Sequence, residues 1–125
     1  MDKAITTIND TKEFIQYWDW IQEIPPLDDT HEQILGHCLL GNYLGLKLYL
    51  NGRVVGIVIY KPINSFIFIV GVYVKKHMNL FVEDAYAFFK KNGYSEVRAY
   101  TTHNEESFAK ITKMQKVCSL FRKEI

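Results

Sequence analysis

The second half of the sequence alternates between strand-like and helix-like segments, and this order constrains the fold more than any other feature. Residues 65–74 contain the apolar run FIFIVGVYV, which is typical of a central strand covered on both faces. A helix capped by Asn79 is predicted at 79–92, followed by a strand at 95–101, a helix at 104–115 and a last strand at 117–124. Because a helical crossover joins the strands at 65–74 and 95–101, we expect these two strands to be parallel.

Three further strands are predicted before this run. Residues 4–8 are β-like, and leucine alternates with other residues from 45 to 50. Asn51–Gly52 predicts a type I′ turn because both positions accept a positive φ, so residues 53–60 should return antiparallel. Gly71, inside the apolar run, indicates a bulge or a close approach to the backbone. The sequence therefore predicts an α/β fold with six strands in one mixed sheet flanked by helices.

Two helices are predicted between the first strand and the hairpin. Apolar residues recur at three- and four-residue spacing from 11 to 24, and Asn9 or Asp10 can cap the start of this helix. Thr30 is expected to cap a second helix at 31–41.

The composition excludes several classes of protein. A chain of 125 residues with 48% hydrophobic residues suits one domain, 1–125, with a single core. No apolar run approaches the roughly 18–20 residues that cross a bilayer, and the N-terminus is not organised like a signal peptide, so we expect no membrane partner and a cytoplasmic location. Cys38 and Cys118 lie in apolar segments and are expected to be buried free thiols. The histidines form no recognisable cluster, so no metal is expected.

The most specific motif lies around the fifth predicted strand. Lys91, Gly93 and Tyr94 end the helix before it, and Asn104 and Ser107 open the helix after it. Asn–x–x–Ser by itself is also an ordinary helix cap. Together with the order of elements, however, this pattern resembles that of the GCN5-related N-acetyltransferases, which bind acetyl-CoA. The resemblance covers nearly the whole chain and implies the fold of that family, without its usual seventh strand.

The resemblance also implies a site for the CoA pyrophosphate in the turn after residue 74, where the family has a glycine-rich loop. This chain has Lys75–Lys76–His77–Met78–Asn79 instead, and a Cβ at each position hinders close approach of the backbone. The helix N-terminus still offers unpaired amides, and the two lysines can supply point charges. The implied cofactor-binding residues are Val72, Val74, Lys75, Lys76, His77, Asn79, Asn104 and Ser107.

The net charge is divided unevenly along the chain. Residues 71–125 carry ten Lys and Arg against six Asp and Glu, whereas residues 1–70 carry five against eight. The basic half suits a polyanionic ligand, and it also suits a solvated surface with scattered lysines.

The catalytic residues that the resemblance implies are incomplete. Many relatives carry a tyrosine seven residues after the motif asparagine, where it protonates the departing thiolate, but Ile111 occupies that position here. A missing general acid slows a reaction by about 100- to 10,000-fold without forbidding it. The candidates for acid or base are Tyr73, Tyr100 and His103. Tyr73 also suits a core position, and His103 also suits an exposed loop.

The sequence leads to three hypotheses of function. The first is a divergent N-acetyltransferase-like protein that transfers an acyl group from acetyl-CoA to an unknown amine, on a small molecule or a protein. The second is a catalytically inactive, phage-encoded protein of the same fold that serves as an interaction or virion-associated protein, as a homo-oligomer or with a virion partner. The third is nucleic-acid binding through Lys110, Lys113 and Lys116 together with Lys75 and Lys76, although no aromatic stacking platform accompanies these lysines.

Overall fold

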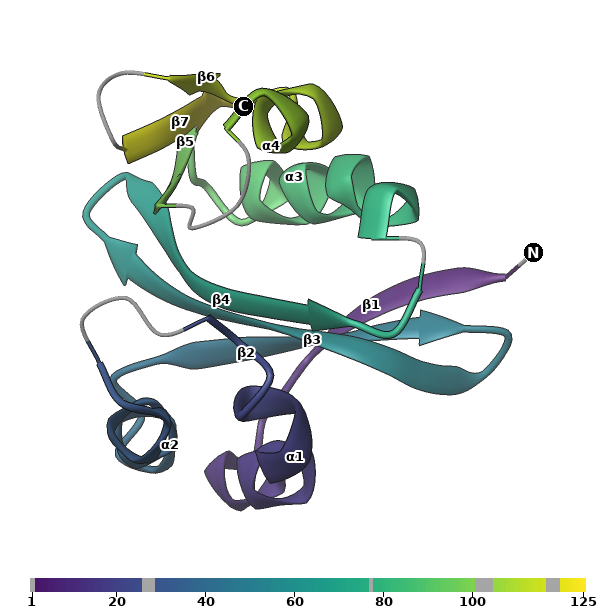
Figure 1. Ribbon diagram of the computed structural model, residues 1–125, viewed down its shortest axis with the longest axis vertical. Coiled ribbons are helices and arrows are strands. Elements are labelled where there is room, and N and C mark those ends of the chain that lie inside the picture. Colours follow the sequence, from purple (N-terminus) through teal and green to yellow (C-terminus); the bar gives the residue numbers. More distant parts are fainter. Residues whose placement is uncertain (1, 26–28, 77, 101–104, 117–119) are drawn as a thin grey trace.

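The computed structural model describes residues 2–25, 29–76, 78–100, 105–116 and 120–125. Among these residues, seven strands form one sheet in the order β1-β2-β3-β4-β5-β7-β6. Figure 1 shows α1 and α2 on one face of this sheet and α3 on the other, with α4 beyond α3. The strands are β1 (Lys3–Thr7), β2 (Leu44–Leu50), β3 (Arg53–Ile63), β4 (Phe66–Val74), β5 (Glu96–Tyr100), β6 (Gln115–Lys116) and β7 (Leu120–Glu124). The helices are η1 (Thr11–Tyr17), α1 (Trp18–Ile21), α2 (His31–Leu39), η2 (Met78–Leu80), α3 (Val82–Lys91) and α4 (Glu105–Thr112).

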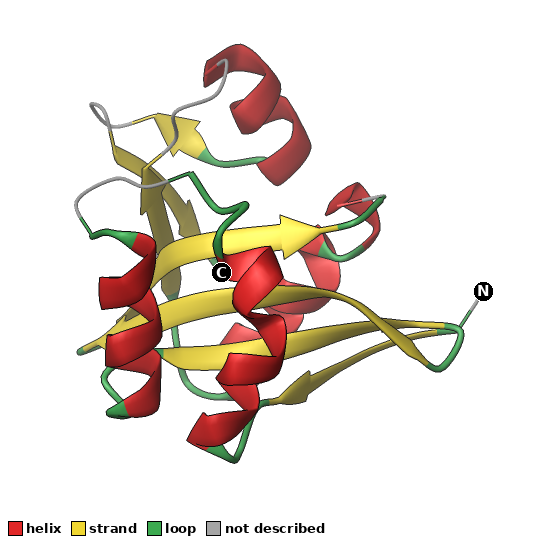
Figure 2. Ribbon diagram, turned by 60° about the horizontal axis from the view of Figure 1, so that its bottom comes forward, coloured by secondary structure: helices red, strands yellow, loops and turns green. Residues whose placement is uncertain are grey.

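The sheet is mixed, as predicted. Strands β1 to β4 pair antiparallel in chain order, and β5 pairs parallel to β4. The turn between β2 and β3 has positive φ at both Asn51 (52°) and Gly52 (80°), which confirms the predicted hairpin. Figure 2 shows the long strands of this sheet passing behind the two N-terminal helices.

The end of the chain corrects the prediction of a single last strand and of a missing seventh strand. The chain leaves α4 at Lys113, whose φ of 57° breaks the helix, and forms the two-residue strand β6. Gln115 pairs with Arg122, so β6 runs antiparallel to β7. No turn signal separates these two strands in the sequence, and residues 117–119 of the predicted strand, with Cys118, lie outside the described residues.

The first predicted helix is shorter and tighter than expected. The Asp10 side chain accepts a 3.0 Å hydrogen bond from the Lys12 amide and starts a 3₁₀ helix, which continues as one short α-helical segment, α1. Many residues of this segment are β-branched or aromatic, which lowers the propensity for a long α-helix. By contrast, α2 begins as predicted at Thr30, whose hydroxyl accepts from the Gln33 amide in a capping box.

Two apolar clusters pack on opposite faces of the sheet. The α3 cluster consists of Leu46, Leu48, Val58, Tyr60, Ile67, Phe81, Tyr86, Phe89, Val97, Ala99 and Met114. The α1/α2 cluster consists of Ile8, Phe14, Ile21, Ile24, Ile34, Cys38, Ile57 and Ile59. Cys38 is fully buried and free, as predicted. In the described part of the chain, no helix has the length and hydrophobicity required to span a membrane.

A bulge in β4 decides which side chains face each cluster. Tyr60 of β3 pairs with Ile69 and Ile59 pairs with Gly71, so Val70 is an extra residue in β4. Val72 and Val74 therefore pack against the α3 cluster, and Tyr73 packs against the α1/α2 cluster. A Cβ on Gly71 would lie 2.3 Å from Cγ2 of Ile24, which confirms the close approach predicted at this glycine.

Candidate functional site

Strands β4 and β5 separate after a short stretch of pairing. Phe66 to Ile69 pair with Glu96 to Ala99, but β4 continues to Val74. Among the described residues, the edge of β4 that faces β5 has no strand partner from Val70 onward. The backbone amides and carbonyls on this edge therefore have no partner from a neighbouring described strand, and we call this stretch of β4 its open edge.

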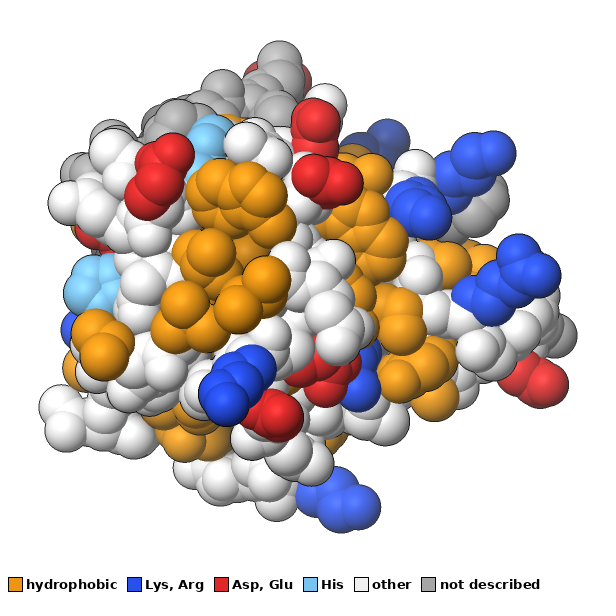
Figure 3. Space-filling model, turned by 90° about the horizontal axis from the view of Figure 1, so that it is seen from below, with side chains coloured by type: hydrophobic (Ala, Val, Ile, Leu, Met, Phe, Trp, Pro, Cys, Tyr) orange, Lys and Arg blue, Asp and Glu red, His pale blue; other side chains and the backbone are white. Residues whose placement is uncertain are grey.

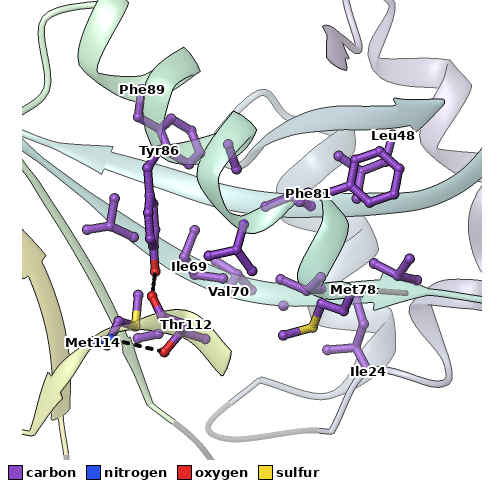
Figure 4. A pocket seen from close by; sticks show the side chains of 18 of the residues that line it. Ile24, Leu48, Ile69, Val70, Met78, Phe81, Tyr86, Phe89, Thr112 and Met114 are labelled. Carbon is purple, nitrogen blue, oxygen red and sulfur yellow. Dashed lines mark hydrogen bonds between the residues drawn. The ribbon is translucent and has the colours of Figure 1, made fainter. Parts of the chain in front are cut away.

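A cavity of about 190 Å³ lies beside this open edge. Its walls come from β4 with Val72 and Val74, from α3 with Val82 and Ala85, and from other elements including β5. Figure 4 shows Ile69 and Val70 near the middle of the cavity, with Tyr86, Thr112 and Met114 toward one side and Met78 and Ile24 toward the other. The cavity is largely apolar, so it favours the hydrocarbon parts of a ligand.

Three side chains in the cavity wall carry a hydroxyl. The buried Tyr86 hydroxyl donates a 2.6 Å hydrogen bond to the Thr112 carbonyl, and burial raises the pKa of Tyr86. The Thr112 hydroxyl accepts a 3.3 Å hydrogen bond from the Met114 amide. Tyr100 is 43% exposed, and its ring packs edge-on against Phe68. No residue in the described cavity wall carries a carboxylate, an imidazole or an amine on its side chain.

Helix α3 begins later than predicted. Asn79 lies in η2 and does not cap α3, which corrects the prediction for this residue. The Phe81 amide donates to the Met78 carbonyl at 3.0 Å, and the Ala85 amide donates to the Phe81 carbonyl at 2.9 Å, so η2 occupies the predicted first turn. Phe81 is the N-cap residue and provides no side-chain hydrogen bond.

Two carboxylates stand in the first turn of α3, beside the place where an anion would bind. Glu83 forms a 2.9 Å ion pair with Lys113, and Asp84 forms a 3.2 Å ion pair with Lys3. Lys113 lowers the pKa of Glu83, so this carboxylate is charged at neutral pH. Acidic residues stabilise a helix N-terminus, but they also oppose the binding of a second anion there.

A stack of aromatic rings on the α1 side of the sheet involves two of the predicted site residues. Trp20 is stacked between Tyr17 and Tyr73, with centroid distances of 5.3 and 5.2 Å. The Lys75 ammonium lies 5.3 Å from the centroid of the Trp20 ring. Lys75 therefore contacts α1, whereas Lys76 is exposed and has no ion-pair partner among the described residues.

The structure brings only some of the predicted site residues together. Val72, Val74 and Tyr100 line the cavity, whereas Tyr73 belongs to the aromatic stack on the other face. Ser107 is an exposed residue of α4. The predicted roles of His77, His103 and Asn104 fall outside the described residues.

Sequence reasoning missed two polar residues of the wall, Tyr86 and Thr112. Tyr86 lies four residues after Val82 and three residues before Phe89. This helical spacing is a sequence signal that the three side chains share one face of the helix. No sequence signal indicated Thr112, because its contact with Tyr86 spans 26 residues.

No family model and no curated protein matches this chain. An IAA acetyltransferase from Bacillus cereus superposes with a TM-score of 0.71 at 12% identity, covering 99% of this chain and 100% of that one. The ribosomal-protein-S18-alanine N-acetyltransferase from Escherichia coli gives 0.72 at 11% identity, covering 94% and 80%.

A third similar structure was determined in complex with CoA. It is the GNAT-family N-acetyltransferase YhbS from Escherichia coli, with a TM-score of 0.69 at 12% identity, covering 98% of this chain and 81% of that one. At these identities the likeness concerns the fold. The chain therefore has the fold of the GCN5-related N-acetyltransferase (GNAT) superfamily.

Proposed function

We propose that this protein binds acetyl-CoA or a related acyl-CoA beside β4 and transfers the acyl group to an amine. The observation that carries the proposal is the open edge of β4 from Val70 to Val74, next to an apolar cavity. Proteins of this fold have been determined with CoA or acetyl-CoA, which supports the class of ligand.

The residues present fit the pantetheine arm of such a ligand. The arm has two amides separated by hydrocarbon, and an open strand edge offers amides and carbonyls that pair with them as a further strand would. Val72 and Val74 place apolar side chains on the cavity side of the same stretch of β4. The arm would thus bond to the backbone of β4 and lie against its apolar wall.

The fit to the pyrophosphate is weaker. The N-terminus of α3 has amides without intrahelical partners, but Glu83 and Asp84 stand in its first turn. Among the described residues, Lys76 is the exposed lysine closest in sequence to this turn. The Lys75 ammonium lies over the Trp20 ring instead. We expect Lys76 to supply most of the charge that the glycine-free turn needs, with His77, Asn79, Asn104 and Ser107 as further proposed contacts.

The transfer itself needs few protein groups. The lone pair of the amine nitrogen attacks the thioester carbonyl carbon, the carbon–sulfur bond breaks with its electron pair going to sulfur, and the amine loses one proton. Holding the two reactants at the β4 edge lowers the entropic part of the barrier. Among the described residues that line the cavity, Tyr100 is exposed and carries a hydroxyl, which would give a proton to sulfur. His103 and Tyr73 are further proposed acids or bases.

A specific observation favours a second candidate, a protein that has the fold but does not catalyse transfer. The described cavity wall holds no carboxylate or imidazole that could act as a base. Figure 3 views the α1 and α2 face and shows patches of hydrophobic side chains. Ile15 of η1 and Leu40 after α2 are 55% and 78% exposed. Such a surface suits an interaction or virion-associated protein, or a homo-oligomer.

One experiment separates the two candidates. The full chain is titrated by calorimetry with acetyl-CoA, with CoA and with adenosine 3′,5′-bisphosphate, which lacks the pantetheine arm. We expect acetyl-CoA and CoA to bind and to raise the melting temperature in proportion to ligand excess, and the bisphosphate to bind much more weakly. Release of free CoA thiol in the presence of a panel of amines then reports transfer.

Each result has a clear meaning. Binding with amine-dependent release of thiol supports the transferase, and binding without release for any amine supports the inactive protein. Failure of CoA, acetyl-CoA and longer acyl-CoA donors to bind at millimolar concentration contradicts the proposed function.

A further inference from the structure

The cavity extends deeper than a strand-edge site requires. Leu48 of β2, Val58 of β3, Phe89 of α3 and Val97 of β5 all line it, and each is at most 5% exposed. These residues belong to the α3 cluster, so the cavity continues into the layer between α3 and the sheet. Protein interiors contain few voids larger than a water molecule, and an empty apolar void destabilises the fold in proportion to its volume.

The deep part of the cavity is unsuited to the polar pantetheine arm. An amide that leaves water needs a hydrogen-bond partner, or its burial is unfavourable. The Tyr86 hydroxyl donates to the Thr112 carbonyl, and the Thr112 hydroxyl accepts from the Met114 amide. Both side chains already have partners, and the remaining wall between α3 and the sheet is hydrocarbon, so this part favours an apolar chain.

We infer that the acyl group of the donor is an apolar chain of up to about six carbons, since an apolar cavity of about 150 Å³ holds a benzene molecule. The whole cavity measures about 190 Å³, and the pantetheine arm along Val72 and Val74 would take part of that volume. This inference rests on the proposed function and adds the class of donor, a medium-chain acyl-CoA. In this proposal the thioester lies at the open edge near Val70, and the acyl chain runs beneath α3 toward Phe89. Figure 4 shows the side chains of Phe81, Tyr86 and Ile69 around this space.

The group transfer is unchanged by the longer chain. The amine nitrogen forms a bond to the acyl carbonyl carbon, the carbon–sulfur bond breaks, and the products are a medium-chain amide and CoA thiol after one proton passes from nitrogen to sulfur. No oxidant or further reactant is required.

The inference is tested by measuring the Kd of the full chain for acetyl-CoA, butyryl-CoA, hexanoyl-CoA and decanoyl-CoA. Each buried CH₂ contributes up to about fourfold in affinity, so we expect hexanoyl-CoA to bind at least tenfold more tightly than acetyl-CoA. We expect decanoyl-CoA to gain nothing over hexanoyl-CoA, because its extra carbons exceed the cavity. Equal affinities for acetyl-CoA and hexanoyl-CoA overturn the inference and leave the proposed function standing. If none of the four binds, the proposed function fails as well.

A cavity-filling variant tests where the acyl chain of the donor binds. Ala85 lines the cavity from α3, whereas Ala87 is exposed on the same helix. Ala85→Phe should reduce the ratio of hexanoyl-CoA to acetyl-CoA affinity at least fivefold, and Ala87→Phe should leave the ratio unchanged. If Ala85→Phe does not fold, Ala85→Leu fills less of the cavity and should reduce the ratio in the same direction. An unchanged ratio in a folded Ala85 variant overturns the inference.

Discussion

The phenol of Tyr86 donates a 2.6 Å hydrogen bond to the backbone carbonyl of Thr112 and so ties α3 to the end of α4 across the cavity. Both residues are buried, at 8% and 6% exposure. In the described part of the chain this bond is a direct polar link between the two helices that enclose the candidate site.

Tyr86→Phe should lower the free energy of unfolding by about 1–2 kcal/mol, because a buried hydrogen bond is lost and nothing replaces the hydroxyl. Urea unfolding followed by circular dichroism measures the change. Tyr94→Phe is the matched control, since Tyr94 packs at the edge of the same α3 cluster and its hydroxyl bonds to none of the described residues. Equal stability of Tyr86→Phe and the unmodified chain would contradict the role assigned to this bond.

Gly71→Ala should destabilise the protein by about 1–3 kcal/mol, because a side chain here overpacks the contact between β4 and the segment that follows α1. The added Cβ would lie 2.3 Å from Cγ2 of Ile24. Ile24→Ala removes that methyl group, so the double variant should lose less than the sum of the two single losses. Additive losses in a double-mutant cycle would show that the two residues do not touch.

Lys76→Ala should weaken CoA binding more than Lys75→Ala does. The Lys75 ammonium lies over the Trp20 ring, whereas Lys76 is exposed and free of ion pairs with the described residues. Calorimetric titrations at several salt concentrations should give a smaller salt dependence for Lys76→Ala, because one phosphate contact is absent. A larger effect of Lys75→Ala would mean that this lysine leaves the ring when the ligand binds.

Glu83→Gln should raise the affinity for CoA by about two- to fivefold at low salt, because a negative charge is removed from the first turn of α3. The matched control is Glu32→Gln in the first turn of α2, on the opposite face of the sheet. Its affinity should equal that of the unmodified chain. If Glu83→Gln binds CoA no better, the pyrophosphate does not bind at the α3 N-terminus.

Alkaline pH should destabilise the protein through Cys38. Burial raises the pKa of this thiol from 9.0 to about 12. Between these values the unfolded chain loses the thiol proton while the folded chain keeps it. The contribution of the protonated Cys38 thiol to the free energy of unfolding is therefore complete below pH 9. It falls by an amount on the order of 1 kcal/mol per pH unit as the pH rises toward 12.

Cys38→Ala provides the comparison for that slope. Its unfolding free energy should fall less steeply between pH 9 and 12 than that of the unmodified chain. Tyr17 and Tyr60, whose pKa values burial raises to about 12, add the same slope above pH 10 to both proteins and cancel in the comparison. Identical slopes would show that Cys38 is accessible to hydroxide in the folded state.

Local rules in the sequence determined much of this fold. The Asn51–Gly52 turn, the Thr30 cap and the parallel crossover between β4 and β5 each depend on neighbouring residues or on chain connectivity, and the structure has all three. The same rules predicted a buried Cys38, because an apolar helical segment packs against a sheet.

Only the tertiary structure decided which side chains of β4 face each side of the sheet, which is called its phase below, and the shape of the site. The run FIFIVGVYV is apolar at nearly every position, so its period does not show which residues face α3. The extra residue Val70 fixes this phase, and it exists because β3 pairs with β4 in one particular register. Likewise, η2 takes the place of a cap by Asn79, and Tyr86 meets Thr112 across 26 residues. Such relationships depend on packing between distant segments, which the sequence of either segment does not specify by itself.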